Sequence, residues 1–239
     1  MTVPAHLGAS GLYRAARKDL LRTPATTREA FELQQVLRSL VSTDLFVGRP
    51  QTVAGVDVAY IAERRLSVAA VVVLKFPELT IVDSVSAWLE TPFPYVPGLL
   101  SFREVPAILK AWEGVRLDPG MIFVDGHGRA HPRRFGVACH LGLILGKPTV
   151  GIGKSRLCGW YEEPGPSRGE RADLVDDEDV IGTVLRTRDR VKPVFVSVGH
   201  GMTLENCVEW TLRVTRRVRL PEPLRMADHA SRVARLERA

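Results

Sequence analysis

Short valine-rich segments separated by polar residues constrain the fold of this 239-residue chain more than any other feature. Three of them follow one another over residues 53–59, 66–75 and 81–88, and their length and β-branched content predict strands. The longest apolar run, residues 68–74, is far shorter than the roughly 20 residues that a membrane-spanning helix needs. The close spacing of the segments predicts a meander, and we expect no membrane association.

Later in the chain, strand-like and helix-like segments alternate. The predicted strands are residues 121–124, 149–152, 181–186 and 194–198. The predicted helices are residues 101–112, 133–145, 203–214 and 224–236. The stretch 162–179 is polar and contains proline and glycine, so we expect a surface loop there. A meander followed by alternation predicts an α/β fold in which helices cover one mixed sheet.

The first predicted helix begins after Thr26, which forms a capping box with Glu29 three residues later. Apolar residues then recur on one face of this helix, at Leu33, Val36, Leu37, Leu40 and Val41. No motif precedes the capping box. We therefore expect residues 1–25 to be an N-terminal extension and residues 26–236 to form a single domain.

The composition, 45% hydrophobic and 25% charged, is that of a globular protein and excludes a disordered or collagen-like chain. The first residues lack the apolar segment of a secretory signal. The three cysteines, Cys139, Cys158 and Cys207, form no CxxC pair, which indicates a reducing compartment without disulfides or a zinc site. We expect a cytoplasmic monomer. A net charge of +6 and a pI near 9.5 favour a polyanionic partner, nucleic acid first.

Four acids occur where a buried element ends or a helix faces inward. Asp57 interrupts an apolar strand, Asp125 ends another, and Glu104 and Asp228 lie on predicted helices. Burying a bare carboxylate costs several kcal/mol unless a cation or hydrogen bonds compensate, and Mg²⁺ or Mn²⁺ suits oxygen ligands. For Asp57 and Asp125, each taken alone, a helix cap or structural hydrogen bond stays an open alternative. The acidic run 176–179, by contrast, is expected to be solvated.

The sequence DGHGRAHPRR follows the strand that Asp125 ends, and His131, Arg133 and Arg134 in it are candidates for binding phosphate. The alternative is a tight turn into a helix with a basic first turn, although cations there oppose the helix dipole unless an anion binds. Lys154 lies in GIGKS, which lacks the full phosphate-loop pattern, so we interpret it as a single active-site cation.

Tyr95 lies between Pro94 and Pro97, whose fixed φ angles stiffen the loop and make the ring a rigid projection. A rigid aromatic side chain on a basic protein can stack on a base or wedge into a duplex. Packing of Tyr95 onto the core is an equally open alternative. Arg103 is a further candidate cation, with a surface salt bridge as its alternative.

Taken together, VAGVDVAY, PYVPGLLSFRE, VDGHGRAHPRRFGVA, PTVGIGKSRL, SVGHGM and LPEPLRMAD resemble the endonuclease V family from about residue 27 to residue 232. The order and spacing of PYVPGLLSFRE and DGHGRAHPRR make the resemblance specific. It implies an RNase H-like fold, which agrees with the mixed sheet expected from the periodicity. It also implies a nuclease that acts on inosine, the product of adenine deamination.

The resemblance implies a role for each matching residue. Asp57 and Asp125 would hold catalytic Mg²⁺, for which Mn²⁺ could substitute, with Glu104 completing the cluster and Asp228 matching a position where some members carry histidine. Lys154 and His131 would contact the scissile phosphate. The predicted DNA contacts are Tyr95, as the wedge, with Pro94, Pro97, Arg103 and Arg133. The predicted pocket for the extruded base comprises Gly98, Leu100, Gly126, Gly128, Gly136 and Leu157.

The implied reaction is hydrolysis of the second phosphodiester bond 3′ to the lesion, leaving 3′-hydroxyl and 5′-phosphate ends, in DNA repair. Two rival hypotheses stay open: an RNase H-like nuclease that reads another feature, and a binding module without catalysis. No motif reads a 2′-hydroxyl, so the sequence does not distinguish inosine in DNA from inosine in RNA.

Overall fold

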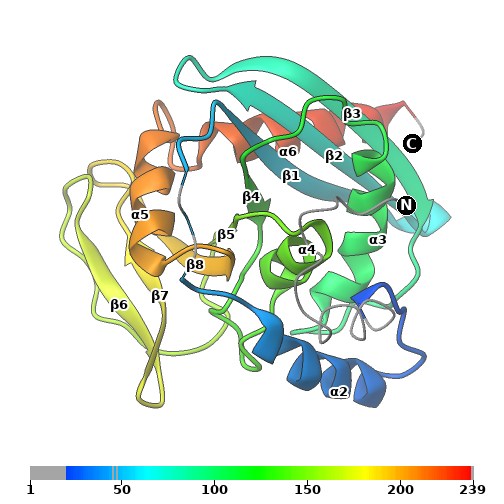
Figure 1. Cartoon of the computed structure of the whole chain (residues 1–239), viewed down its shortest axis with the longest axis horizontal. Coiled ribbons are helices and arrows are strands. Elements are labelled where there is room, and N and C mark those ends of the chain that lie inside the picture. The colour runs from blue at the N-terminus through cyan, green and yellow to red at the C-terminus, as the bar shows by residue number, and fades with distance from the viewer. Residues whose placement is uncertain (1–19, 45, 47, 238–239) are drawn as a thin grey trace.

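The computed structural model describes residues 20–44, 46 and 48–237, and its centre is an eight-stranded mixed sheet (Figure 1). The strands lie in the order β3-β2-β1-β4-β5-β8-β7-β6. Their bounds are β1 Thr52–Ile61, β2 Leu66–Lys75, β3 Thr80–Glu90, β4 Met121–Asp125, β5 Thr149–Gly153, β6 Arg171–Asp176, β7 Asp179–Leu185 and β8 Val194–His200.

The sheet combines a meander with a parallel centre. β1, β2 and β3 pair antiparallel, as the three valine-rich segments predict. β1 then pairs parallel with β4, and β4 parallel with β5. Beyond β5 the strands β8, β7 and β6 are antiparallel again. The predicted α/β class with one mixed sheet is confirmed.

Helices cover both faces of the sheet (Figure 1). The helices are α2 Thr27–Leu37, α3 Leu100–Trp112, α4 Val137–Leu145, α5 Leu204–Arg213 and α6 Glu222–Leu236. Alternate strand residues separate the two layers: Ala54 and Val71 pack beneath α3 and α4, whereas Val53 and Val72 pack beneath α5 and α6. Because both faces of β2 are covered, residues 67–74 are all buried, which explains the continuous apolar run.

Four local predictions are wrong. The expected loop 162–179 contains β6, an edge strand whose mostly polar side chains hide the period-2 pattern, paired with β7. The helix expected from residue 133 begins at Val137. On α2 the side chain of Val36 is 58% exposed, although Leu33 and Leu37 are buried as expected. Asp176 of the acidic run is paired with Arg134, at 2.7 Å.

Several other expectations are met. Thr26 caps α2 by accepting a hydrogen bond from the Glu29 backbone N–H. Cys139, Cys158 and Cys207 are all free. Within the described residues, no helix is both long and apolar enough to cross a bilayer. Residues 1–19 of the predicted extension lie outside the described residues.

Candidate active site

Asp57 and Asp125 lie side by side at one edge of the central sheet. β1 and β4 are parallel neighbours in which Val56 pairs with Val124, so the residues that follow reach the same edge. Burial raises the pKa of Asp57 to about 7; the hydroxyl of Ser231 opposes this shift by donating to Oδ2 at 2.5 Å, and the charge of Asp125 adds to it. The two carboxylates are therefore held close together, and repulsion between their negative charges disfavours the state in which both are ionised.

Glu104, on the second turn of α3, is the third acid of this edge. Its side chain is 8% exposed, and the hydroxyl of Tyr60 donates to its Oε1 at 2.8 Å. The pKa of Glu104 is raised to about 8, chiefly by burial; the Tyr60 hydrogen bond opposes this shift, and the charges of Asp57 and Asp125 contribute to it. These effects place the three acids close enough to interact electrostatically.

Lys154 follows β5, the strand beside β4, and its ammonium forms an ion pair with Oδ2 of Asp125. Asp57 and Asp228 also act on its charge. The structure therefore places Lys154 at the acid cluster, where a cation was predicted. Its contact with a scissile phosphate stays a prediction.

Helix α6 approaches β1 closely and carries Ser231 to Asp57 and Asp228 toward Lys154. A Cβ at Gly55 would lie 2.1 Å from the carbonyl oxygen of Pro223, so only glycine allows this approach. One turn apart on the same helix, Asp228 and Ser231 then face the acid cluster. Asp228 also accepts a hydrogen bond from Arg232 at 3.0 Å, and its role as a metal ligand stays a prediction.

The acid cluster fits a hard divalent cation by its chemistry. The cluster contains three carboxylates, and the pKa values of two of them, Asp57 and Glu104, are raised. A cation would offset the negative charge of the ionised cluster, and oxygen is the donor that Mg²⁺ and Mn²⁺ prefer. Among the described residues, no group of three or more acidic, histidine or cysteine side chains is arranged so that it could hold a metal ion without rearrangement. The ammonium of Lys154 supplies the nearest positive charge in this arrangement.

A cavity of about 100 Å³ lies between the Tyr95 loop and the loop that precedes α4. Of the predicted base-pocket residues, Gly98, Leu100, Gly136 and Leu157 line it. Gly126 and Gly128 do not: the N–H of Gly128 donates to Ser197 at 2.9 Å, behind the cavity wall.

Tyr95 lines the mouth of this cavity, and its side chain is 67% exposed. The alternative that it packs onto the core is wrong. Within the described part of the chain Arg103 forms no salt bridge; its guanidinium lies 4.1 Å from the ring centroid of Tyr60 and 6.0 Å from that of Tyr95. The projecting ring and the neighbouring cation are compatible with the predicted DNA contacts, which stay predictions.

His131 and Arg133 are turned toward the protein. The side chain of His131 is 3% exposed; its Nε2 donates to the carbonyl of Gly98 at 2.9 Å and its Nδ1 accepts from the Arg133 N–H at 3.1 Å. Both ring nitrogens of His131 are therefore already hydrogen-bonded, and neither is free for the predicted contact with the scissile phosphate. Arg134, another phosphate candidate, is paired with Asp176 and Asp179 instead.

Three residues of the site were missed in the sequence. Ser101 and His127 line the cavity, and Ser101 Oγ and His127 Nε2 are buried without a hydrogen-bond partner among the described residues. Gln34 of α2, also in the wall, is 1% exposed. His127 lies within DGHG and Ser101 within PYVPGLLSFRE, so the motifs contained the signal for two of them; Gln34 lies in no motif.

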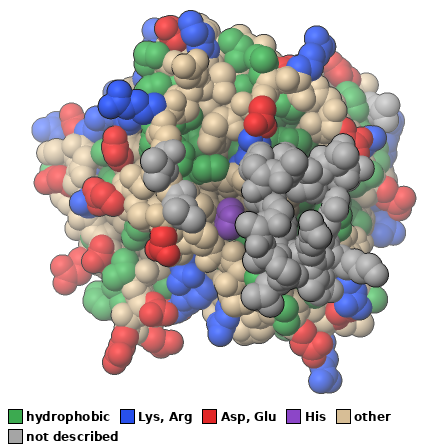
Figure 2. Space-filling view, viewed as in Figure 1, with side chains coloured by type: hydrophobic (Ala, Val, Ile, Leu, Met, Phe, Trp, Pro, Cys, Tyr) green, Lys and Arg blue, Asp and Glu red, His purple; other side chains and the backbone are tan. Residues whose placement is uncertain are grey.

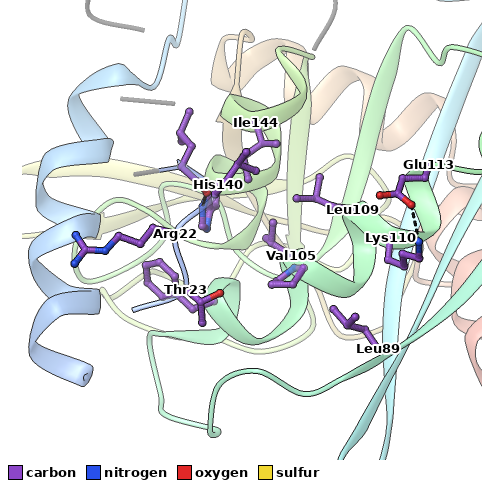
Figure 3. Close-up of a pocket in the computed structure, with 13 residues that line it drawn as sticks. Arg22, Thr23, Leu89, Val105, Leu109, Lys110, Glu113, His140 and Ile144 are labelled. Atoms are coloured by element: carbon purple, nitrogen blue, oxygen red, sulfur yellow. Dashed lines mark hydrogen bonds and ion pairs between the residues drawn. The ribbon is translucent and has the colours of Figure 1, made fainter. Parts of the chain in front are cut away.

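A second cavity, of about 310 Å³, lies between α3, α4 and residues 20–23 (Figure 3). Its wall is mainly apolar, with His140 at its base and the Lys110–Glu113 ion pair at its rim (Figure 3). None of the predicted site residues lines it.

The arginines near the C-terminus mostly bind the protein itself. Arg213 stacks on Trp210 at 4.3 Å, Arg216 donates to the carbonyl of Glu78 at 3.0 Å, and Arg219 to that of Pro193 at 2.8 Å. On the face in Figure 2, the described basic and acidic side chains are interspersed and do not gather into one basic patch. Any phosphate contact of these three arginines would therefore compete with contacts inside the molecule.

An eight-stranded mixed sheet with helices on both faces, and three acids and Lys154 beside its central strands, define an α/β protein with an acidic site. The sequence model of the family described as Endonuclease V matches residues 34–229. The Endonuclease V of Nostoc punctiforme is 46% identical over 206 residues, which cover 86% of this chain and 93% of that protein. The chain belongs to the Endonuclease V family, whose members are metal-dependent nucleases.

Solved structures agree with this assignment. The Endonuclease V of Streptomyces avermitilis is 47% identical, with a TM-score of 0.86 over 90% of this chain and 95% of that one. The Endonuclease V of Ciona intestinalis, solved in complex with a 23mer DNA that contains an inosine followed by a ribo-adenosine, is 28% identical. Its TM-score is 0.79, over 88% of this chain and 97% of that one.

Proposed function

We propose that this protein is a Mg²⁺-dependent endonuclease, with Mn²⁺ able to substitute, that recognises inosine in DNA. It hydrolyses the second phosphodiester bond 3′ to the lesion and leaves 3′-hydroxyl and 5′-phosphate ends for repair. The main support for the proposal is the cavity beside the exposed ring of Tyr95. It is lined by Ser101 and His127, whose Oγ and Nε2 atoms have no hydrogen-bond partner among the described residues, and the same molecule carries the acids at the sheet edge. The inosine-containing DNA held by the Ciona intestinalis relative supports the substrate class.

The cavity suits a flipped base. Extruding a base costs a few kcal/mol, and less when the base is mispaired, so inosine opposite a wrong partner leaves the duplex more readily. Ser101 Oγ and His127 Nε2 each lack a partner and would gain one from the polar edge of hypoxanthine. Adenine presents an amine where hypoxanthine has a carbonyl, so hydrogen-bond mismatch excludes it. Guanine keeps the carbonyl but carries an N2 amine that hypoxanthine lacks, so size excludes it. Tyr95 would fill the gap left in the duplex.

The acids would hold the metal: Asp57 and Asp125 first, with Glu104 and Asp228 beside them. The bound metal supplies an activated water and stabilises the leaving 3′ oxygen. Ser231 and Tyr60 hold the carboxylates of Asp57 and Glu104 in place by hydrogen bonds. Lys154 offsets the negative charge of Asp125 and lies where it can bind the incoming phosphate. We also propose that the protein acts as a cytoplasmic monomer.

The test uses an end-labelled duplex with one inosine, a matched duplex with adenine at that position, and the same inosine strand made with ribonucleotides. The proposal predicts a single Mg²⁺-dependent nick one nucleotide beyond the inosine on its 3′ side and no nick in the adenine duplex. Equal cutting of the inosine and adenine duplexes would instead show a nuclease that reads another feature. Cutting of the ribonucleotide strand alone would make RNA the substrate.

A further inference from the structure

Gln34 is a buried polar side chain on α2, a helix otherwise packed onto the surface of the molecule. Its Nε2 donates to the carbonyl of Gly98 at 2.9 Å and to that of Phe135 at 3.1 Å. Its Oε1 accepts a hydrogen bond from Nε of Arg133. A side-chain amide so deeply buried is stabilised by being fully hydrogen-bonded. One of these bonds reaches Gly98 in the cavity wall, and the others reach Arg133 and Phe135, which precedes the wall residue Gly136.

The carbonyl oxygen of Gly98 accepts hydrogen bonds from three donors, all at the same distance. They are Nε2 of Gln34, Nε2 of His131 and Nη2 of Arg133, each at 2.9 Å. A carbonyl has two lone pairs, so this oxygen is saturated and has no free lone pair for a base in the cavity. Gly98 adopts a φ of +79°, which glycine takes readily and other residues rarely do, and the three bonds hold its carbonyl in one direction.

The apolar face of α2 packs against residues that precede the Tyr95 loop and against residues that follow it. Ala30 and Leu33 pack with Phe93, which precedes the loop, and with Leu99 and Phe102, which follow it. Tyr95 lies between these anchors. The helix α2 thus sets the position of the Tyr95 ring and the width of the cavity, through this apolar cluster and through the side-chain amide of Gln34.

We propose that Gln34 is a positioning residue that fixes the Gly98 carbonyl and so sets Tyr95 and the cavity wall for acceptance of the extruded base. This inference rests on the proposed function, because it assigns the residue to recognition of the lesion. Gln34 touches none of the three acids, so it acts on how the lesion is held and not on the hydrolysis of the bond.

The substitution Gln34→Met removes both donors and the acceptor while keeping a side chain of similar length. Gly98 retains two of its donors, so the fold persists while the loop gains freedom. We expect KM for the inosine duplex to rise about 10-fold while kcat at saturating DNA stays within about twofold, the pattern of a lost binding interaction. Preference for inosine over adenine duplexes, measured as a ratio of Kd in EDTA, falls with it.

The matched control is Gln35→Met, which makes the same change at the next position of α2, where the side chain is exposed. Hydrogen exchange of the amides of residues 94–100 gives a second readout that needs no substrate. The inference predicts faster exchange of these amides in Gln34→Met and in Arg133→Met, which removes another donor to the same carbonyl, and no change in Gln35→Met. If Gln34→Met does not fold, the exchange of Arg133→Met decides.

Unchanged exchange of residues 94–100 in Gln34→Met would overturn the inference. So would a loss of kcat at saturating DNA with KM unaltered, or equal effects in Gln34→Met and Gln35→Met. Should the parent protein fail to cut the inosine duplex, the proposed function falls, while the exchange experiment still decides whether Gln34 holds the loop.

Discussion

At the scale of the residue, Tyr95 shows how a side chain can be held rigidly without being buried. Pro94 and Pro97 fix the backbone on either side of it, and its ring stays 67% exposed. An exposed aromatic ring contributes little to the stability of the folded chain, so its replacement separates recognition from folding.

Tyr95→Ala is expected to leave the melting temperature unchanged and to weaken binding of an inosine duplex by about 5- to 150-fold, the range of one lost base–aromatic stack. Binding of an undamaged duplex, which needs no wedge, should change less. Fluorescence anisotropy in EDTA with both duplexes measures the difference. Equal losses on the two duplexes would mean that the ring contributes only general affinity.

At the scale of the element, the contact between α6 and β1 brings Ser231 to Asp57 and Asp228 toward Lys154. The contact depends on Gly55, since a Cβ there would meet the carbonyl of Pro223 at 2.1 Å. Backbone atoms cannot yield as the end of a side chain can, so a methyl group at this position must displace the helix.

Gly55→Ala is therefore expected to lower the free energy of unfolding by about 1–3 kcal/mol, as overpacking in a core does. Cleavage should fall more than stability alone explains, because Ser231 moves away from Asp57. Urea unfolding and single-turnover cleavage measure the two effects. Gly48→Ala, where the new Cβ would make an ordinary contact of 3.7 Å with Phe46, should change neither.

The sequence predicted most elements, but not those set by tertiary contacts. The valine-rich strands, and Asp57 and Asp125 as acids in or at the end of a strand, followed from local pattern; that the two strands are neighbours did not, because their pairing is a long-range contact. β6 did not, because an edge strand with polar side chains is recognised only through its partner β7. His131 and Arg133 were predicted as phosphate ligands because they are cationic types in a loop; their real partners, Gln34 and Gly98, are distant in the sequence.

At the scale of the whole molecule, buried histidines couple stability to pH. Burial lowers the pKa of His131, His140 and His200 to about 4 each. His140 packs between Phe102 and Phe135 beneath the cavity of Figure 3, with ring centroids 5.3 and 5.4 Å away. The unfolded chain binds protons at these sites from about pH 6.5 downward, whereas the folded chain does not until about pH 4.

This stabilisation is fully present above about pH 6.5 and is lost as the pH falls toward 4. Asp57 and Glu104, whose pKa values are raised to about 7 and about 8, bind protons in the folded chain first and so oppose this loss. Because the three histidines outnumber the two acids, we expect the melting temperature to fall across that window, and His140→Leu to make the fall shallower by removing one of the buried sites. Differential scanning calorimetry from pH 7 to pH 4.5 checks this. His229→Leu, at an exposed position of α6, should reproduce the parent slope, and an equally steep fall in His140→Leu would contradict the assignment.

The central claim is that one part of the molecule recognises the lesion and the carboxylates at the sheet edge cut the strand. The most direct test measures binding and product in the same samples of parent, Asp57→Asn and Asp125→Asn with a single-inosine duplex and Mg²⁺. The account predicts that both variants bind the inosine duplex in preference to an adenine duplex, as the parent does, but lose cleavage by at least about 100-fold, as expected when catalytic metal ligands are removed. Cleavage by either variant at the parent rate would contradict it.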